Sequence, residues 1–152
     1  LILAFNIFPY IQNLSSFIEA LHIVNPQGTL AVRQYDGASI RFGPMPTSQR
    51  QDMEVDLRIA TENSNKFHHY DLDRTFIALQ NSSYTFKHYG FELFERSSPF
   101  PEDFIAYYQD TLKWTYEHIS EKSASQLRKW IDEDPLLKNR YFYEVDLVAL
   151  LS

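Results

Sequence analysis

Residues 29–42 read TLAVRQYDGASIRF, and they carry the clearest local signal in the chain. Two mainly apolar segments, Thr29–Tyr35 and Ala38–Phe42, flank the dipeptide Asp36-Gly37. Asp-Gly tolerates the positive φ angles of a type I′ turn, which is a preferred tight connection between antiparallel strands. The stretch therefore predicts a β-hairpin, and with it a sheet of antiparallel strands.

The segment before this hairpin has the spacing of an amphipathic helix. From about Pro9 to Val24, apolar residues recur at three- and four-residue intervals, which places them on one helix face. Residues 25–28 (NPQG) then supply turn formers that end a helix. We expect an N-terminal helix whose apolar face packs on the sheet.

The segment after the hairpin alternates between polar and apolar side chains. Residues 52–59 read DMEVDLRI, which is the pattern of a strand with one buried face and one wet face. The wet face would carry Asp52, Glu54 and Asp56. We therefore expect a strand with an acidic outer surface at this point in the chain.

A second hairpin is expected from Thr75–Leu79 and Tyr84–Glu95. The apolar positions of its second arm change parity near Gly90, which predicts a β-bulge there. Residues 87–94 (KHYGFELF) of this arm resemble the octapeptide of RNA recognition motifs, in which a basic residue and aromatic rings contact the bases. The resemblance implies an RNA-binding strand. The acidic charge of the chain favours a plain core strand and no nucleic-acid partner.

The last third of the chain is mainly helical. Glu102–Ile119 and Ser125–Asp132 have helical periodicity, and acids in the first turn of the longer helix suit its dipole. Arg140–Leu151 alternates weakly and fits an edge strand or a final helix. Together the segments predict an α+β fold, with a sheet of about five antiparallel strands, an N-terminal helix and C-terminal helices packed on one face. We expect residues 1–152 to form a single domain.

The composition is that of a globular chain with an unusual share of aromatic residues. Hydrophobic residues make up 44% and charged residues 22% of the 152 positions, which is sufficient for a core. Aromatic residues make up 16%, and the 10 tyrosines cannot all be buried, because each hydroxyl needs a partner or water. Some rings are therefore expected to be half-exposed, where they either suit contact with another molecule or, as is more common, pack around a sheet with their hydroxyls in water.

The charge and the missing residue types exclude several functions. The chain has 14 Lys and Arg against 20 Asp and Glu, a net charge of −6, which disfavours nucleic acid and favours basic partners. It has no Cys, so thiol catalysis, thiolate zinc sites and disulfides are excluded. The four glycines are too scattered for a phosphate-binding loop, and the common hydrolase and kinase motifs are missing. These observations favour a protein without enzymatic activity, cofactor or bound metal, and they leave open an enzyme with an unfamiliar site.

The sequence shows no sign of insertion into a membrane. The apolar opening, Leu1–Phe8, lacks the basic flank and the cleavage site of a signal peptide. No apolar run reaches the length of a membrane-spanning helix. We expect a soluble, cytoplasmic protein that does not bind membranes.

Residues 68–73 (HHYDLD) form the cluster with the best metal-binding chemistry. In an extended segment alternate side chains share a side, so His69, Asp71 and Asp73 would point together. An imidazole with two carboxylates suits a divalent ion such as Mn²⁺ or Fe²⁺. A distant fourth ligand is not recognisable, so a solvated polar loop is the favoured interpretation.

The feature that favours a particular function is an acidic surface beside exposed rings. Tyr107 and Trp114 lie on a stripe of the long helix away from its predicted core positions. Aromatic anchors beside a charged rim are typical of protein interfaces. We therefore expect a protein-binding module in which Asp52, Glu54 and Asp56 attract a basic partner and the two rings anchor it. The element order looks like that of small acidic secretion chaperones, and immunity proteins that inhibit basic toxins are similarly small and acidic.

A second interpretation places the function in a cavity. A bulged sheet covered by helices can enclose an aromatic-lined pocket between the sheet and the long helix. Such a pocket would hold a small apolar ligand or substrate. This alternative, and a possible homodimer, stay open at the level of the sequence.

Overall fold

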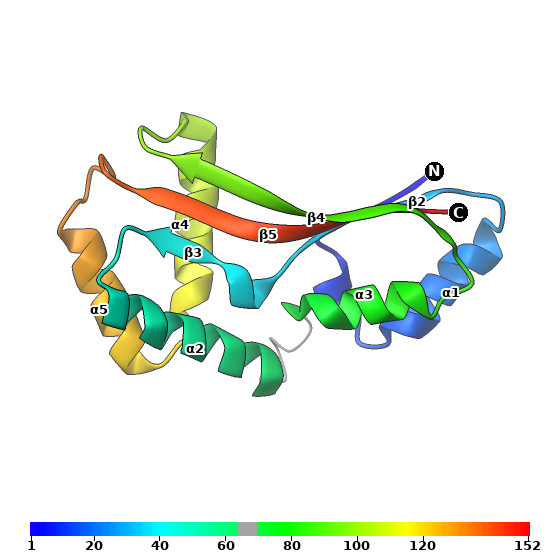
Figure 1. Ribbon diagram of the computed structural model, residues 1–152, viewed down its shortest axis with the longest axis horizontal. Helices are drawn as coiled ribbons and strands as arrows, with labels where there is room; N and C mark the ends of the chain where they lie inside the picture. Colours follow the sequence, from blue (N-terminus) through cyan, green and yellow to red (C-terminus); the bar gives the residue numbers. More distant parts are fainter. Residues whose placement is uncertain (64–69) are drawn as a thin grey trace.

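The computed structural model describes residues 1–63 and 70–152, and the described residues form five helices, two short 3-10 turns and a five-stranded sheet. In chain order the elements are β1 (Ile2–Phe5), η1 (Phe8–Tyr10), α1 (Leu14–Val24), β2 (Leu30–Tyr35), η2 (Gly37–Ser39), β3 (Arg41–Gly43), α2 (Thr47–Asn63), α3 (Leu72–Gln80), β4 (Phe86–Ser97), α4 (Glu102–Tyr116), α5 (Glu121–Asp132) and β5 (Tyr141–Leu151). Figure 1 shows β4 and β5 as one long ribbon with the helices distributed along it.

The C-terminal strand β5 is the centre of the sheet. β2 and β3 pair antiparallel with one edge of β5, one after the other, and β4 pairs antiparallel with its other edge. β1 pairs parallel with β2, because α1 carries the chain back between these two strands. The α+β class is confirmed, but the sheet is mixed rather than purely antiparallel, since it contains this one parallel pair.

The predicted hairpin at residues 29–42 is wrong, although both of its arms contain strands. None of the described glycines has a positive φ angle, so Asp36-Gly37 does not form a type I′ turn. Instead the Asp36 carboxylate accepts hydrogen bonds from the Ala38 N–H and the Ser39 hydroxyl and caps the 3-10 turn η2. This turn carries the chain forward, so β3 continues along β5 beyond the end of β2.

Residues 52–59, predicted as a strand, lie inside helix α2. Met53 and Leu57 are buried, one helical turn apart, while Val55 is 41% and Ile59 is 48% exposed. Burial therefore follows the period of a helix and not the two-residue alternation of the letters. The acidic strand face expected here does not exist as a strand.

The second predicted hairpin is also wrong. Thr75–Leu79 belongs to helix α3, which Asp71 caps with its side chain. The other arm is a strand, β4, but its partner is β5. The bulge of β4 lies between Phe86 and His88 rather than near Gly90.

The two ends of the chain differ from the prediction in what they add to the sheet. β1 precedes the expected N-terminal helix, which begins only at Leu14, where the Asn13 side chain accepts from the Ser16 N–H. Both predicted C-terminal helices are present, as α4 and α5. The segment Arg140–Leu151 forms β5, which is the central strand and neither an edge strand nor a helix.

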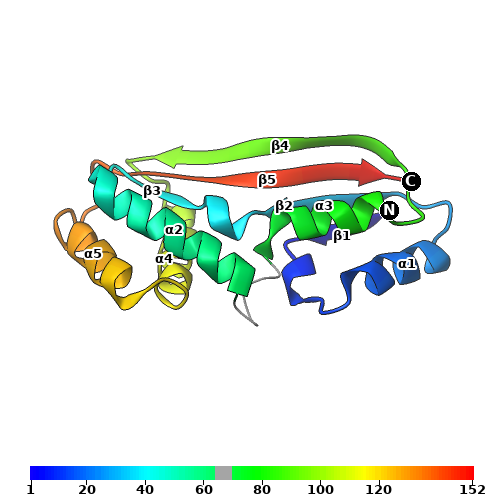
Figure 2. The same ribbon diagram turned by 60° about the horizontal axis from the view of Figure 1, so that its bottom comes forward.

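Two clusters of buried side chains hold the helices against the sheet. One joins α1 and α3 to β1, β2 and the C-terminal half of β5, and the other joins α2, α4 and α5 to the opposite half. The buried residues of β5 change parity between the halves, since Leu147 and Ala149 serve the first cluster and Phe142 the second. Twist allows this change, because the faces of a twisted strand rotate along its length. Figure 2 shows the helices gathered on one side of the β4–β5 ribbon.

Candidate functional site

A pocket lined by aromatic rings lies where β1 and β2 end, and it encloses about 210 Å³. Its lining consists of five rings, one carboxylate and one hydroxyl side chain: Tyr10, Tyr35, Tyr70, Tyr107, Trp114, Asp110 and Thr111. Ligand sites are typically lined by aromatic and apolar side chains with a few polar groups. The lining therefore makes this aromatic pocket the candidate site.

Asn6 joins the carboxyl ends of β1 and β2. Its N–H donates to the Arg33 carbonyl at 2.8 Å, and its side-chain oxygen accepts from the Tyr35 N–H at 3.1 Å. Asn6 has a φ angle of 51°, a left-handed conformation that asparagine tolerates better than most residues. The turn at Asn6 leads the chain into η1, which brings Tyr10 to the same pocket as Tyr35.

Helix α4 supplies the opposite wall. Tyr107, Asp110, Thr111 and Trp114 recur at three- and four-residue spacing, so they share one helix face. The core face of the same helix consists of Phe104, Tyr108, Leu112 and Thr115. Because this second face is buried, it fixes the rotation of α4 and therefore the direction in which the pocket residues point.

Tyr70 lies at the centre of the ring cluster and is 6% exposed. Its ring centroid lies 5.3 Å from that of Trp114, 5.4 Å from that of Tyr35 and 6.0 Å from that of Tyr10. Its hydroxyl donates to the Tyr10 hydroxyl at 2.9 Å. Edge-to-face and tilted ring pairs at these distances are stabilising, so the cluster holds the pocket wall in one arrangement.

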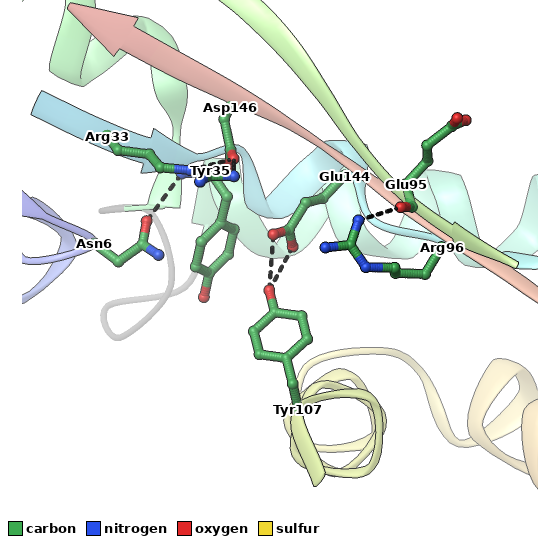
Figure 3. Close-up of polar contacts among 8 residues, drawn as sticks. All are labelled: Asn6, Arg33, Tyr35, Glu95, Arg96, Tyr107, Glu144 and Asp146. Carbon is green, nitrogen blue, oxygen red and sulfur yellow. Dashed lines mark hydrogen bonds and ion pairs between the residues drawn. The ribbon is translucent and has the colours of Figure 1, made fainter. Parts of the chain in front are cut away.

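A buried carboxylate lies at the hydroxyl end of Tyr107. The Tyr107 hydroxyl donates to both carboxylate oxygens of Glu144, at 2.8 and 2.7 Å (Figure 3). Glu144 is 4% exposed, and burial raises its pKa to about 7 although the hydrogen bond from Tyr107 favours the charged form. Burial also raises the pKa of the Tyr107 and Tyr35 hydroxyls, so both rings carry neutral hydroxyls at the pocket.

A second buried carboxylate, Asp146, is paired with Arg33 (Figure 3). It accepts from Arg33 Nε at 2.7 Å and also from Nη2 of the same guanidinium. The Asp146 side chain is 2% exposed, whereas that of Arg33 is 43% exposed. After burial and the Tyr107 bond, the Asp146 charge raises the pKa of Glu144 further, and Arg33 lowers it. The strand β5 thus brings two carboxylates with different surroundings to one end of the pocket.

The three acids predicted to attract a basic partner lie on helix α2. Asp52 pairs with Lys122 at 2.7 Å, and Glu54 lies 3.5 Å from the nitrogens of two arginines. Asp56 accepts hydrogen bonds from both the N–H and the hydroxyl of Ser120, the residue that caps α5. All three acids therefore have partners inside the chain, and none of them lines the aromatic pocket.

Both predicted aromatic anchors, Tyr107 and Trp114, line the pocket. Tyr107 is 36% exposed, while Trp114 packs against the core cluster of α2, α4 and α5. Thr111 lies on the same outward stripe of the long helix, and the helical period could also have indicated Asp110. The partners from other segments were missed, because no spacing rule relates positions so far apart, and the high tyrosine content was the only signal for them. These missed residues are Tyr10, Tyr35, Tyr70 and Glu144.

The metal and RNA hypotheses concern other parts of the structure. His69 lies outside the described residues, and Asp71 caps α3. Across residues 1–63 and 70–152, no group of three or more His, Cys, Asp or Glu side chains could hold a metal ion. Residues 87–94 lie in β4, whose partner is β5 alone in the described sheet, so they do not form a central strand. No helix in the described ranges has the length and apolar character to cross a membrane.

A larger hollow, of about 670 Å³, lies between α1 and α3. Its guanidinium group comes from Arg74, which donates hydrogen bonds to the backbone carbonyls of Phe8, Ile11 and Gln12. Burial lowers the pKa of Arg74, but a guanidinium stays charged at any physiological pH. Arg74 therefore ties the loop before α1 to α3, and we assign it a structural role.

Comparison with protein-family models finds no match for this chain. Comparison with curated proteins likewise finds no match. The aromatic pocket is therefore interpreted from its own geometry.

Proposed function

We propose that this protein binds a small, mainly apolar organic molecule in the aromatic pocket. The observation that carries the proposal is the convergence of five rings, from four separate segments, on one cavity at the ends of two parallel strands. A ligand that covers such rings removes apolar surface from water, and this burial stabilises a complex. The ring cluster around Tyr70 is preorganised, so little conformational freedom is lost on binding.

The cavity limits the size of the ligand. Its volume of about 210 Å³ lies below the roughly 300–1,000 Å³ typical of pockets for drug-sized molecules. Among the described lining residues, Asp110 and Thr111 are the only ones other than tyrosine and tryptophan, so charged and aliphatic polar contacts from this part of the wall are few. Shape and ring contacts therefore decide affinity, with the tyrosine hydroxyls setting orientation.

Isothermal titration calorimetry with a panel of small aromatic and aliphatic compounds tests this proposal. Thr111→Phe should abolish binding, because the larger side chain fills the cavity from the α4 wall. Gln109→Phe is the matched control, since Gln109 lies exposed on the same helix and outside the pocket lining. Binding that is equally strong in both variants would refute the assignment, as would the failure of every compound to bind the unaltered protein.

Binding of a basic protein through Asp52, Glu54 and Asp56 is still a prediction. The internal contacts of these acids favour the pocket over it, because a partner would have to compete with Lys122 and Ser120. Charge reversal at Glu54 and Asp56 should slow association with such a partner and flatten its salt dependence. Unchanged association kinetics would remove these acids from any interface.

A separate observation supports self-association through β4. Tyr89, Phe91 and Leu93 are 50%, 55% and 56% exposed, and long apolar edge strands invite pairing. An antiparallel two-fold register that sets Phe91 opposite its own copy also sets Tyr89 opposite Leu93, so the apolar row is self-complementary. Sedimentation should show a dimer that Phe91→Lys dissociates and Leu3→Lys, on the far edge strand, does not. A monomer at high protein concentration would contradict it.

A further inference from the structure

The described lining of the aromatic pocket carries one formal charge, the carboxylate of Asp110. The rings add to its field, because the face of each aromatic ring carries the negative end of its quadrupole. Glu144, which shares the hydrogen of the Tyr107 hydroxyl between its two oxygens, adds a negative charge only where it is ionised, above about pH 7.

Two arginines of neighbouring segments have other partners. Arg33 is engaged with Asp146. Arg74 donates to backbone carbonyls at Phe8, Ile11 and Gln12, and neither arginine is part of the described lining. Within residues 1–63 and 70–152, a ligand with a positive charge would therefore meet rings and a carboxylate without a competing cation from the lining.

We infer that the ligand is a small organic cation with a quaternary or alkylated ammonium group, an inference that rests on the proposed ligand-binding function of the pocket. Such a group is apolar at its surface and positively charged, so it satisfies both the rings and Asp110. Tyr35, Tyr70 and Trp114 would contact the alkylated nitrogen with their ring faces, as in aromatic cages. A hydrated inorganic cation is disfavoured, because the described lining offers a single carboxylate and otherwise only neutral hydroxyl oxygens.

Choline and 3,3-dimethyl-1-butanol form a matched pair of probes, because they have the same shape and differ only at one atom. Choline has a charged nitrogen where the alcohol has a neutral carbon. Titration calorimetry should show choline binding at least about fivefold more tightly than the neutral alcohol. Equal affinity for the two would overturn the cation inference and leave the proposed function standing. The same holds if neither binds while uncharged aromatic compounds do. If no compound of either panel binds, both proposals fall.

A pair of charge-removing variants separates the carboxylate from the rings. Asp110→Asn should weaken choline binding about threefold or more and leave the affinity for 3,3-dimethyl-1-butanol unchanged, because only the cation senses the lost charge. Asp103→Asn is the control, since Asp103 lies in the first turn of the same helix and outside the pocket lining. Equal losses for both ligands in Asp110→Asn would show a structural effect and would contradict the charge-based inference.

Discussion

Glu144→Gln tests whether the buried carboxylate beside the pocket is held at a cost to stability. Glu144 is 4% exposed, and the Tyr107 hydroxyl is the donor to both of its oxygens. Glutamine has the same shape and keeps one oxygen that can accept from Tyr107. The substitution therefore removes the titratable charge while it preserves the packing and one hydrogen bond.

The magnitude follows from proton binding in the two states. In the unfolded chain Glu144 loses its proton near the ordinary pKa of 4.5, whereas in the folded chain it keeps the proton up to about pH 7. The folded state binds more protons within this window, so the free energy of unfolding falls as the pH rises through it. One pH unit corresponds to about 1.4 kcal/mol, so ionised Glu144 costs about 3 kcal/mol above the window and nothing below it.

Urea unfolding at about pH 5 and about pH 8 measures the effect. The free energy of unfolding of Glu144→Gln should lie close to that of the unaltered protein at the lower pH. At the higher pH it should exceed that value by about 2–3 kcal/mol. Glu95→Gln, an exposed change on β4, should have little effect at either pH. A stability difference that does not change with pH, or a Glu144→Gln variant that is less stable at the higher pH, would refute the reasoning.

Three further sets of substitutions test the fold. Leu57→Ala should lower the free energy of unfolding by about 2–5 kcal/mol, because Leu57 is fully buried in α2. Val55→Ala, at a position 41% exposed, should cost less than about 1 kcal/mol. The reverse order of the two losses in urea titrations would contradict the assignment of residues 52–59 to a helix. Asn6→Gly should be less destabilising than Asn6→Ala, since glycine keeps the left-handed backbone and loses only the side-chain hydrogen bond; equal melting temperatures would argue against strain at that turn. Arg33→Ala leaves buried Asp146 without its guanidinium and should cost about 1–3 kcal/mol, less than a fully buried pair because Arg33 is 43% exposed. The melting temperature of Arg33→Lys should lie between those of the unaltered protein and Arg33→Ala. If Arg33→Ala melts at the same temperature as the unaltered protein, the Arg33–Asp146 pair contributes nothing to stability.

The error at α2 has a simple physical origin. Met53 and Leu57 are four residues apart, which is two periods of a strand and nearly one turn of a helix. Val55, halfway between them, fits only the strand period, and packing shows that it is left exposed on the helix. The long helix α4 was predictable because its apolar positions fit the helical period alone.

The error at residues 29–42 has a different origin. Asp36-Gly37 is compatible with a type I′ turn, but the Asp36 carboxylate can equally cap a 3-10 turn, as it does here. The choice depends on β5, which offers one edge long enough to pair with β2 and then with β3. The residues of that edge lie about a hundred positions later in the chain, so a rule based on neighbouring residues cannot predict this pairing.

Local periodicity and composition were sufficient to establish the α+β class, the helices α1, α4 and α5, and the excess of tyrosine. Hydrogen bonds within helices and the spacing of apolar side chains involve residues that are close in the sequence, so both can be predicted from short stretches of it. Tertiary contacts alone decided the partner of each strand, the parallel pair β1–β2 and the convergence of five rings on one pocket. These features join residues that are remote in the chain, such as Arg33 and Asp146, 113 positions apart, and the packing of the whole core selects them.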